Sequence, residues 1–234
     1  MSRRRNAGDG GGEFIEVVSS EGEIPSNSSG GSGNFFEDNQ MMIIGAAALI
    51  GLIVCAYFAY KFLYKAPREK EATEQIYKAE QQFLKDSFAL ALEAPGGGYD
   101  GFLDIIDNYG GTKTGNIAKY YAGISYLNLG RFEDAISYLN SYNESGNVTS
   151  ITKYGALGDA YSELGDVSKA LSSYSKATSK DVGVLTPYYL HKLGILSYRE
   201  GDNDQAAKAF NRLKSEFPSA PEAEDASKYL GMLN

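Results

Sequence analysis

The strongest constraint on the fold is a motif that occurs three times in the second half of the chain. Each copy has a glycine, a second glycine seven residues later and an alanine twelve residues after the first. The motif positions are Gly123, Gly130 and Ala135, then Gly158, Gly165 and Ala170, then Gly194, Gly201 and Ala206. Repetition at a nearly constant period predicts an array of similar structural units that stack on one another, in place of one central core.

Helix packing explains the motif. The first glycine and the alanine lack bulk, so we predict that Gly123, Ala135, Gly158, Ala170, Gly194 and Ala206 let two antiparallel helices approach closely. The second glycine supplies the left-handed conformation that ends the first helix. Asp166 and Asp202 follow as predicted N-caps of the second helix. Two helices in about 34 residues is the tetratricopeptide repeat (TPR) period, so the predicted fold is an all-α TPR superhelix.

The segments on either side of the three clear repeats predict two further helical units. Residues 77–93 follow the same template, with Ala79 and Ala91 twelve positions apart, but a glycine-rich stretch interrupts them before a second predicted helix. We interpret this region as a degenerate N-terminal unit. At the other end, Pro218 stops the last repeat, and the amphipathic segment after it predicts a C-terminal capping helix.

A run of twenty residues without a charge, Met41–Tyr60, precedes the repeats. At 1.5 Å per residue, a helix of about this length spans the hydrocarbon core of a bilayer. Aromatic residues and lysines follow the run, as is typical of a membrane interface, and no positively charged region adjoins its start, as a signal peptide would require. We therefore predict an uncleaved transmembrane helix. The predicted domains are a disordered tail at 1–38, the transmembrane helix at 39–64, a juxtamembrane helix with the degenerate unit at 65–115, and the TPR repeats with their cap at 116–234.

Composition argues against several classes of function. The net charge of -8 gives no basic surface for nucleic acid. One cysteine and one histidine are too few for a thiolate metal site or a Cys/His nucleophile pair. The sequence "GGTKT" at 110–114 lacks the upstream glycine of a phosphate-binding loop, and we interpret it as an inter-helix turn with Thr114 as N-cap. We predict no catalytic residue, no metal and no cofactor, and hence no enzyme.

The repeat register predicts the residues that line the concave groove of the superhelix. The predicted partner-binding residues are Ile117, Tyr120, Ile124, Leu127 and Asn128 in the first repeat, Asp159 in the second, and Tyr188, His191, Ile195, Tyr198 and Arg199 in the third. The remaining register positions of the second repeat are Thr152, Gly155, Ser162 and Glu163. Arg199 is the one cation in this set, so a clamp for acidic peptide tails is not expected. The aromatic and aliphatic lining favours an apolar segment or a partner helix.

Three stretches carry a resemblance to a known family: "KFLYKAPREKEATEQIYKAEQQFLKDSFALAL" (61–92), "GFLDIIDNYGGTKTGNIAKYYAGISYLNLG" (101–130) and "LTPYYLHKLGILSYREGDNDQAAKAF" (185–210). Over residues 35–234 the chain resembles the bacterial ancillary Sec-translocon subunit family (YfgM-like), in its Bacteroidetes-type form. The resemblance implies a single-span inner-membrane protein with a periplasmic TPR domain. It further implies Sec translocon subunits and a membrane-anchored peptidyl-prolyl isomerase-like chaperone as partners, with newly translocated secreted proteins as clients.

The local charge pattern favours the opposite orientation. Lys61, Lys65, Arg68 and Lys70 follow the apolar run, whereas residues 21–40 contain no lysine or arginine. The positive-inside rule therefore places the C-terminal domain in the cytoplasm. The resemblance implies the periplasm, and because translocation of a long domain largely ignores nearby charge, we favour that orientation. The alternative functions are a TPR coordinator of envelope assembly or cell division and a cytoplasm-facing TPR adaptor.

Overall fold

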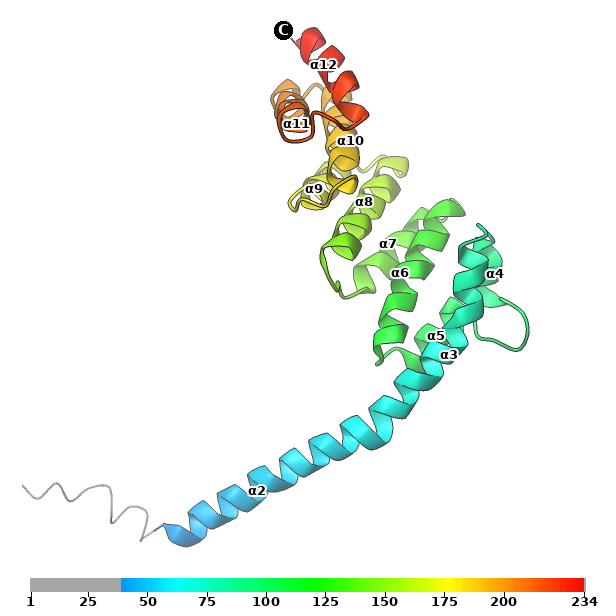
Figure 1. The fold of residues 1–234 in the computed structure, drawn as a ribbon, viewed down its shortest axis with the longest axis vertical. Coiled ribbons are helices and arrows are strands. Elements are labelled where there is room, and N and C mark those ends of the chain that lie inside the picture. The colour runs from blue at the N-terminus through cyan, green and yellow to red at the C-terminus, as the bar shows by residue number, and fades with distance from the viewer. Residues whose placement is uncertain (1–38, 234) are drawn as a thin grey trace, which may run out of the picture. The chain divides into compact units, whose positions relative to one another are not determined.

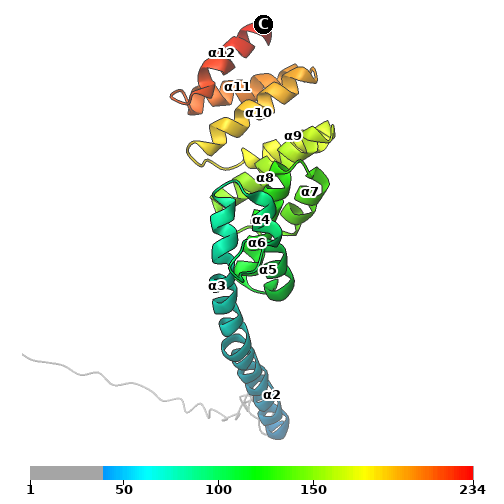
Figure 2. The ribbon, with the colours of Figure 1, turned by 90° about the vertical axis from the view of Figure 1, so that its right-hand side faces the viewer.

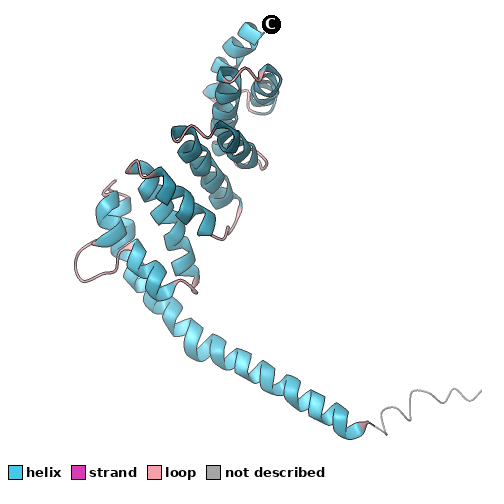
Figure 3. Ribbon diagram, turned by 180° about the vertical axis from the view of Figure 1, so that it is seen from behind, coloured by secondary structure: helices cyan, strands magenta, loops and turns pink. Residues whose placement is uncertain are grey.

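The computed structural model describes residues 39–233, which form helices joined by turns, with no strand among them (Figure 3). The elements are α2 (Gln40–Ala59), η1 (Tyr60–Lys65), α3 (Ala66–Phe83), α4 (Phe88–Glu93), α5 (Phe102–Tyr109), α6 (Lys113–Asn128), α7 (Phe132–Ser141), α8 (Asn147–Glu163), α9 (Val167–Ala177), α10 (Leu185–Arg199), α11 (Asn203–Glu216) and α12 (Glu222–Leu233). The predicted all-α fold is confirmed. The predicted tail, 1–38, lies outside the described residues. The chain divides into two compact units, one that ends at Val54 and one that begins at Cys55.

Helix α2 carries the apolar run, and none of its residues is buried. Among residues 39–233, one helix, which begins at Gln40, is long and apolar enough to cross a membrane by length and composition. Its helical path continues through η1, a short π-helix, into α3, which ends at Phe83. Large side chains such as Met41 and Leu52 are mostly exposed, 85% and 71%. Hydration of exposed apolar surface of this extent is unfavourable.

Three helix pairs, α6/α7, α8/α9 and α10/α11, follow one another along the chain and pack in that order (Figures 1 and 2). The first helix of each pair ends at the second motif glycine. Gly130, Gly165 and Gly201 have φ of 74°, 73° and 79°, the left-handed region that side chains with a Cβ disfavour. The carboxylates of Asp166 and Asp202 accept N–H bonds from the first turns of α9 and α11, as predicted for N-caps.

In each pair the first motif glycine faces a large side chain sixteen residues later, a position outside the predicted motif. The three pairs are Gly123 with Leu139, Gly158 with Tyr174, and Gly194 with Phe210. A Cβ on Gly194 would lie 2.5 Å from Cε1 of Phe210, which is closer than van der Waals contact allows. The motif alanines Ala135, Ala170 and Ala206 are fully buried. The glycines therefore make room for an aromatic or aliphatic ridge on the second helix of the pair.

The degenerate unit keeps the same template in modified form. Ala79 and Ala91 are fully buried in one apolar cluster. Asp86, seven residues after Ala79, takes the place of the left-handed glycine and has φ of 56°. The second helix of the unit is split into α4 and α5, and Phe102 of α5 stacks on Tyr121 of α6 at a ring-centroid distance of 5.1 Å. The unit thus packs on the first clear repeat although its second helix is interrupted.

A carboxylate from α3 caps the start of α6. Glu69 accepts the backbone N–H of Lys113 at 2.6 Å through Oε2, and the N–H and hydroxyl of Thr114 at 3.0 and 2.8 Å through Oε1. The Oγ1 of Thr112 accepts the next N–H, that of Gly115, at 2.9 Å. The prediction of Thr114 as N-cap is therefore wrong. Thr112 is the N-cap, and Thr114 lies inside the helix, because Glu69 supplies the acceptors that the first turn lacks.

We expect Glu69→Gln to lower the free energy of unfolding of the full chain in detergent by about 1 kcal/mol at neutral pH, since a helix cap contributes this order. Partial burial raises the pKa of Glu69, but the bonds from Lys113 and Thr114 outweigh it, so the folded pKa lies below the ordinary 4.5. A lowered folded pKa gives stability that is present above 4.5 and is lost as the pH falls below it.

Urea titrations of the wild type and of Glu69→Gln, at neutral pH and near pH 4, check this prediction. The difference between their free energies of unfolding should be smaller at the acidic pH. Glu74→Gln on the same helix is the control, because its pair with Lys70 is long, 3.9 Å, and exposed. If Glu69→Gln and Glu74→Gln lowered the free energy of unfolding equally, a capping role for Glu69 would be contradicted.

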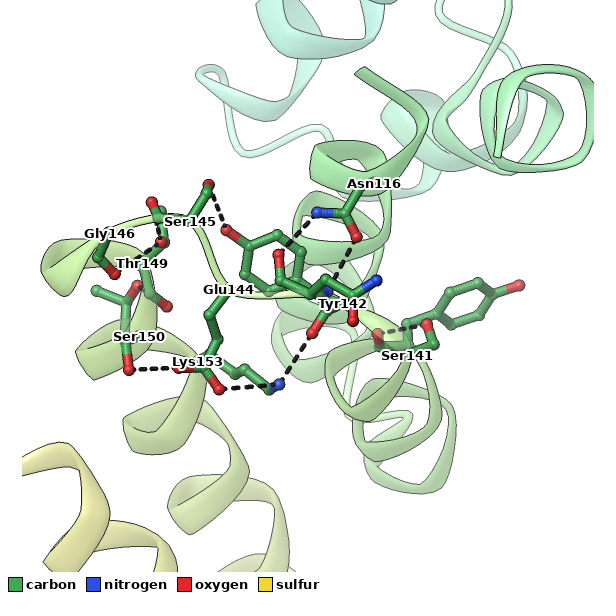
Figure 4. A network of polar contacts seen from close by, with 12 residues as sticks. Asn116, Ser141, Tyr142, Glu144, Ser145, Gly146, Thr149, Ser150 and Lys153 are labelled. Atoms are coloured by element: carbon green, nitrogen blue, oxygen red, sulfur yellow. Dashed lines mark hydrogen bonds and ion pairs between the residues drawn. The ribbon is translucent and has the colours of Figure 1, made fainter. Parts of the chain in front are cut away.

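A buried lysine holds the loop between the first and second repeats (Figure 4). The Nζ of Lys153 donates to the carbonyl oxygen of Tyr142 at 2.9 Å and lies 3.4 Å from Oε1 of Glu144, whose other oxygen accepts the hydroxyl of Ser150 at 2.6 Å. Asn116 bridges the same loop from α6 through two bonds to the backbone of Asn143. These contacts join α6, the loop and α8, and so connect the first repeat to the second.

The last repeat ends as the sequence predicts. Helix α11 stops at Glu216, two residues before Pro218. Helix α12 then covers the apolar side of α10 and α11, where Tyr229 stacks on Phe210 at 5.0 Å and meets Tyr198 edge-on at 5.3 Å. The capping helix therefore buries apolar surface that a further repeat would otherwise cover.

Candidate functional site

The candidate site is a concavity of about 700 Å³ on the first helices of the three repeats, α6, α8 and α10. It brings together seven residues at the predicted groove positions, namely Leu127, Asn128, Asp159, Ser162, Glu163, Ile195 and Arg199. We name this concavity the groove site. Its other lining residues are Gly130, Phe132, Tyr174, Lys192 and Leu196. The lining therefore mixes aliphatic and aromatic side chains with both signs of charge.

Asp159 is the centre of a polar cluster inside the groove site. Its Oδ1 accepts the hydroxyl of Tyr174 at 2.6 Å and an N–H of the Lys192 ammonium at 2.7 Å. These three residues come from α8, α9 and α10, because the stacking of the repeats brings Lys192 back to a residue 33 positions earlier in the chain. The ammonium of Lys192 also lies 4.9 Å from the ring centroid of Tyr188. The cluster links the second and third repeats within the lining of the groove site.

Lys192 and Tyr174 keep their ordinary protonation states near neutral pH. Burial raises the pKa of the Tyr174 hydroxyl, and its bond to Asp159 raises it further. Burial lowers the pKa of Lys192, but its bonds to Asp159 and Tyr188 outweigh this effect, and the net shift is upward. Lys192 is thus cationic and Tyr174 neutral at pH 7. The cluster neutralises one acid with one base, so Glu163 and Arg199 carry the remaining charge of the groove site.

The other predicted partner-binding residues lie outside the lining of the groove site. Ile117, Tyr120 and Ile124 pack against neighbouring helices as partly buried side chains, and the hydroxyl of Tyr120 donates to Oγ1 of Thr152 at 3.0 Å. Tyr188 is 42% exposed, with its edge against Tyr189.

His191 and Tyr198 contact the capping region. The Nε2 of His191 lies 3.8 Å from the carboxylate of Asp225 in α12, and its ring lies edge-on to Phe210. The ring of Tyr198 meets Tyr229, also in α12. The structure therefore places these two residues beneath the capping helix, whereas Arg199 lies in the groove site.

Among the five lining residues outside the repeat register, Lys192 and Tyr174 are the two that bond to Asp159. Lys192 lies two positions before the motif glycine Gly194, and the groove register skips that position. Tyr174 is the large residue sixteen positions after Gly158, on the second helix of its pair. The alignment of the three repeats contains this signal, because Leu139 and Phe210 occupy the equivalent position.

Comparison with known proteins agrees with this geometry. Residues 118–145 and residues 156–221 each match a family model described as tetratricopeptide repeat. The chain contains TPRs. They cover α6 with α7, and the stretch from within α8 to the α11–α12 turn. The predicted repeat type is confirmed.

Solved structures show the same fold at low sequence identity. A crystal structure of nearly identical TPR-like repeats, from a candidate kinesin light chain of Podosopora anserina, matches with a TM-score of 0.51 and 11% identity over 70% of this chain and 85% of the other. A point-substituted variant of the same repeats matches with the same TM-score and identity, over 70% and 84%. A comparison with curated protein sequences gives no match. The similarity at this identity concerns the fold and extends the TPR-like architecture across most of the chain.

Proposed function

We propose that the protein is a membrane-anchored TPR scaffold that binds a segment of another protein in the groove site. The observation that carries this proposal is the groove site itself, in which Leu127, Phe132 and Ile195 lie beside two side chains of opposite charge, Glu163 and Arg199. Neither charge has an ion-pair partner among the described residues 39–233. Such a lining suits a short apolar segment with flanking polar groups, since the apolar contacts give affinity and the charges set the orientation.

Anchoring supports weak recognition of this kind. If α2 spans a bilayer, every groove site is confined near the membrane, and the effective concentration toward a membrane partner rises without additional contacts. A groove of about 700 Å³ then needs only modest intrinsic affinity. This is the physical reason to prefer a membrane-associated partner over a soluble one.

The finer assignment follows the resemblance of residues 35–234 to the ancillary Sec-translocon subunit family. In this role the TPR domain lies in the periplasm of a bacterial inner membrane and passes newly translocated proteins to periplasmic chaperones. Lys61, Lys65, Arg68 and Lys70 after the span favour the alternative of a cytoplasm-facing TPR adaptor. A TPR coordinator of envelope assembly or cell division is the other alternative. Protease accessibility in spheroplasts separates the two orientations, because only a periplasmic domain is cleaved without lysis.

Crosslinking with mass spectrometry on intact membranes tests the proposed partners. We expect translocon subunits among the main adducts, and we expect Ile195→Asp to reduce those adducts about tenfold or more, since a charge at the centre of an apolar contact removes a dominant interaction. Val184→Asp is the matched control, because Val184 is 83% exposed and lies outside the groove site. Equal adduct yields from the two variants would refute the groove site. Adducts that Ile195→Asp removes but that lack translocon subunits would support a scaffold with one of the alternative roles.

A further inference from the structure

A second pocket, of about 290 Å³, lies where the chain leaves the apolar helix, and we infer that it binds the phosphodiester of an anionic phospholipid headgroup. One side consists of Tyr60, Tyr64, Lys65 and Arg68, and the other consists of the α5–α6 turn, namely Asp107, Asn108, Gly110, Gly111 and Thr112. We name it the juxtamembrane pocket. The inference rests on the proposed membrane anchoring.

Arg68 is positioned to hold a phosphate oxygen. Its guanidinium lies over the rings of Tyr64 and Tyr109, 5.2 and 5.6 Å from their centroids, and one N–H donates to the carbonyl oxygen of Asn108. A guanidinium has five N–H donors in a planar fork that matches phosphate. The two rings and the carbonyl fix the plane of the group, and further donors remain for a ligand. Arg68 therefore presents a preorganised fork at the wall of the pocket.

The charges that face the pocket favour an anion. Lys65 and Arg68 are its two cations, and Asp107 is the one carboxylate among its lining residues. The nearby carboxylate of Glu69 is already bonded to the first turn of α6. With two cations against one acid, the pocket attracts a phosphodiester. A choline headgroup adds a positive charge that these cations repel, so an anionic lipid is preferred to a zwitterionic one.

The place of the pocket in the chain matches the depth of the headgroup layer. Helix α2 ends at Ala59, and Tyr60 and Tyr64 follow directly. Arg68 lies nine residues beyond Ala59, roughly 14 Å along a helix. The headgroup region of one leaflet is about 5–7 Å thick beyond the hydrocarbon core. The two tyrosines then lie at the interface that aromatic rings prefer, and the long side chains of Lys65 and Arg68 extend back toward the phosphates.

Native mass spectrometry of the full chain, released from vesicles with equal phosphatidylglycerol and phosphatidylcholine, tests the inference. We expect the wild type to retain phosphatidylglycerol preferentially. Lys65→Gln with Arg68→Gln should reduce this preference roughly tenfold, because each cation near an anionic surface contributes several-fold to binding. Lys65→Gln alone should reduce it severalfold, and this exposed residue cannot act by unfolding the domain.

The matched control is Lys61→Gln with Lys70→Gln, which removes the same charge from the same segment outside the pocket. We expect it to change the preference less than about twofold. An equal loss in both double variants would overturn the inference, since attraction would then come from the segment as a whole. Retention of inorganic phosphate by the lipid-free chain, lost with Arg68→Gln, would also overturn it in favour of a soluble phosphate site.

Flotation of the same vesicles separates this inference from the proposed function. A wild-type chain that does not float with vesicles refutes the anchoring and, with it, the pocket assignment. A chain that floats but shows no lipid preference refutes the pocket assignment alone. The expected result is that wild type and all variants float equally, while the lipid preference depends on Lys65 and Arg68.

Discussion

Phe210→Ala is expected to lower the free energy of unfolding by about 3–5 kcal/mol, the range for removing a large buried aromatic side chain. Phe210 is fully buried, stacks on Tyr229 at 5.0 Å and fills the space that Gly194 leaves open. Its removal leaves a cavity between α10, α11 and the capping helix α12. Urea titration of the full chain in detergent, followed by helical circular dichroism, measures the loss. A loss below about 1 kcal/mol would show that Phe210 does not join the last repeat to its cap.

A double-mutant cycle tests the contact between Gly194 and Phe210 directly. Gly194→Ala alone should destabilise by about 1–3 kcal/mol, because the added Cβ meets the Phe210 ring at 2.5 Å. In combination with Phe210→Leu the cost should be less than the sum of the single changes, since the smaller side chain accommodates the methyl group. Gly231→Ala is the matched control. Its Cβ would meet nothing within 4 Å, so a neutral or slightly stabilising effect is expected. Strict additivity in the cycle would contradict the contact.

The second large effect is expected at Lys153, whose side chain is 9% exposed. Lys153→Met leaves the carbonyl oxygen of Tyr142 and one oxygen of Glu144 without their donor (Figure 4). Breaking a buried pair costs about 3–5 kcal/mol, and we expect a value near 3 because Glu144 keeps its bond to Ser150. The same urea titration measures it. The loop between the first two repeats should lose its amide protection from hydrogen exchange at the same time.

Lys169→Met provides the comparison. Lys169 pairs with Asp166 at 2.6 Å, a shorter distance than the 3.4 Å between Lys153 and Glu144, but its side chain is 62% exposed. An exposed pair contributes about 1 kcal/mol or less. If Lys153→Met and Lys169→Met lowered the free energy of unfolding by the same small amount, burial of Lys153 would not be the source of its contribution to stability. A large loss in Lys153→Met alone supports the loop as a fixed joint between repeats.

Much of the fold follows from positions within one repeat. The motif glycines, the aspartate N-caps and Pro218 act on neighbouring residues, so their spacing predicts the ends of α6, α8, α10 and α11 and the starts of α9 and α11. The side chain that packs against each motif glycine could not be predicted in the same way. Leu139, Tyr174 and Phe210 are all large, but nothing local shows that they, and not the motif alanines, fill the space beside the glycine.

Part of the candidate site also follows from the repeat register. Ile195 and Arg199 line the groove site at the predicted positions, together with five other register residues. Tyr120 and His191 satisfy the same register but pack against neighbouring helices. The register identifies the face of a helix, whereas neighbouring helices decide how much of that face stays open. The capping helix, for example, covers His191 and Tyr198 but leaves Arg199 in the groove site.

The sequence by itself determined the helices, their pairing within each repeat and the apolar helix before them, because each depends on side chains a few turns apart. Only the tertiary structure decided which residues of different repeats meet. Lys192 reaches Asp159 across 33 positions, and Glu69 reaches Thr114 across 45. Such contacts depend on the rotation from one helix pair to the next. That rotation arises from the packing of whole interfaces, so no local spacing in the chain encodes it.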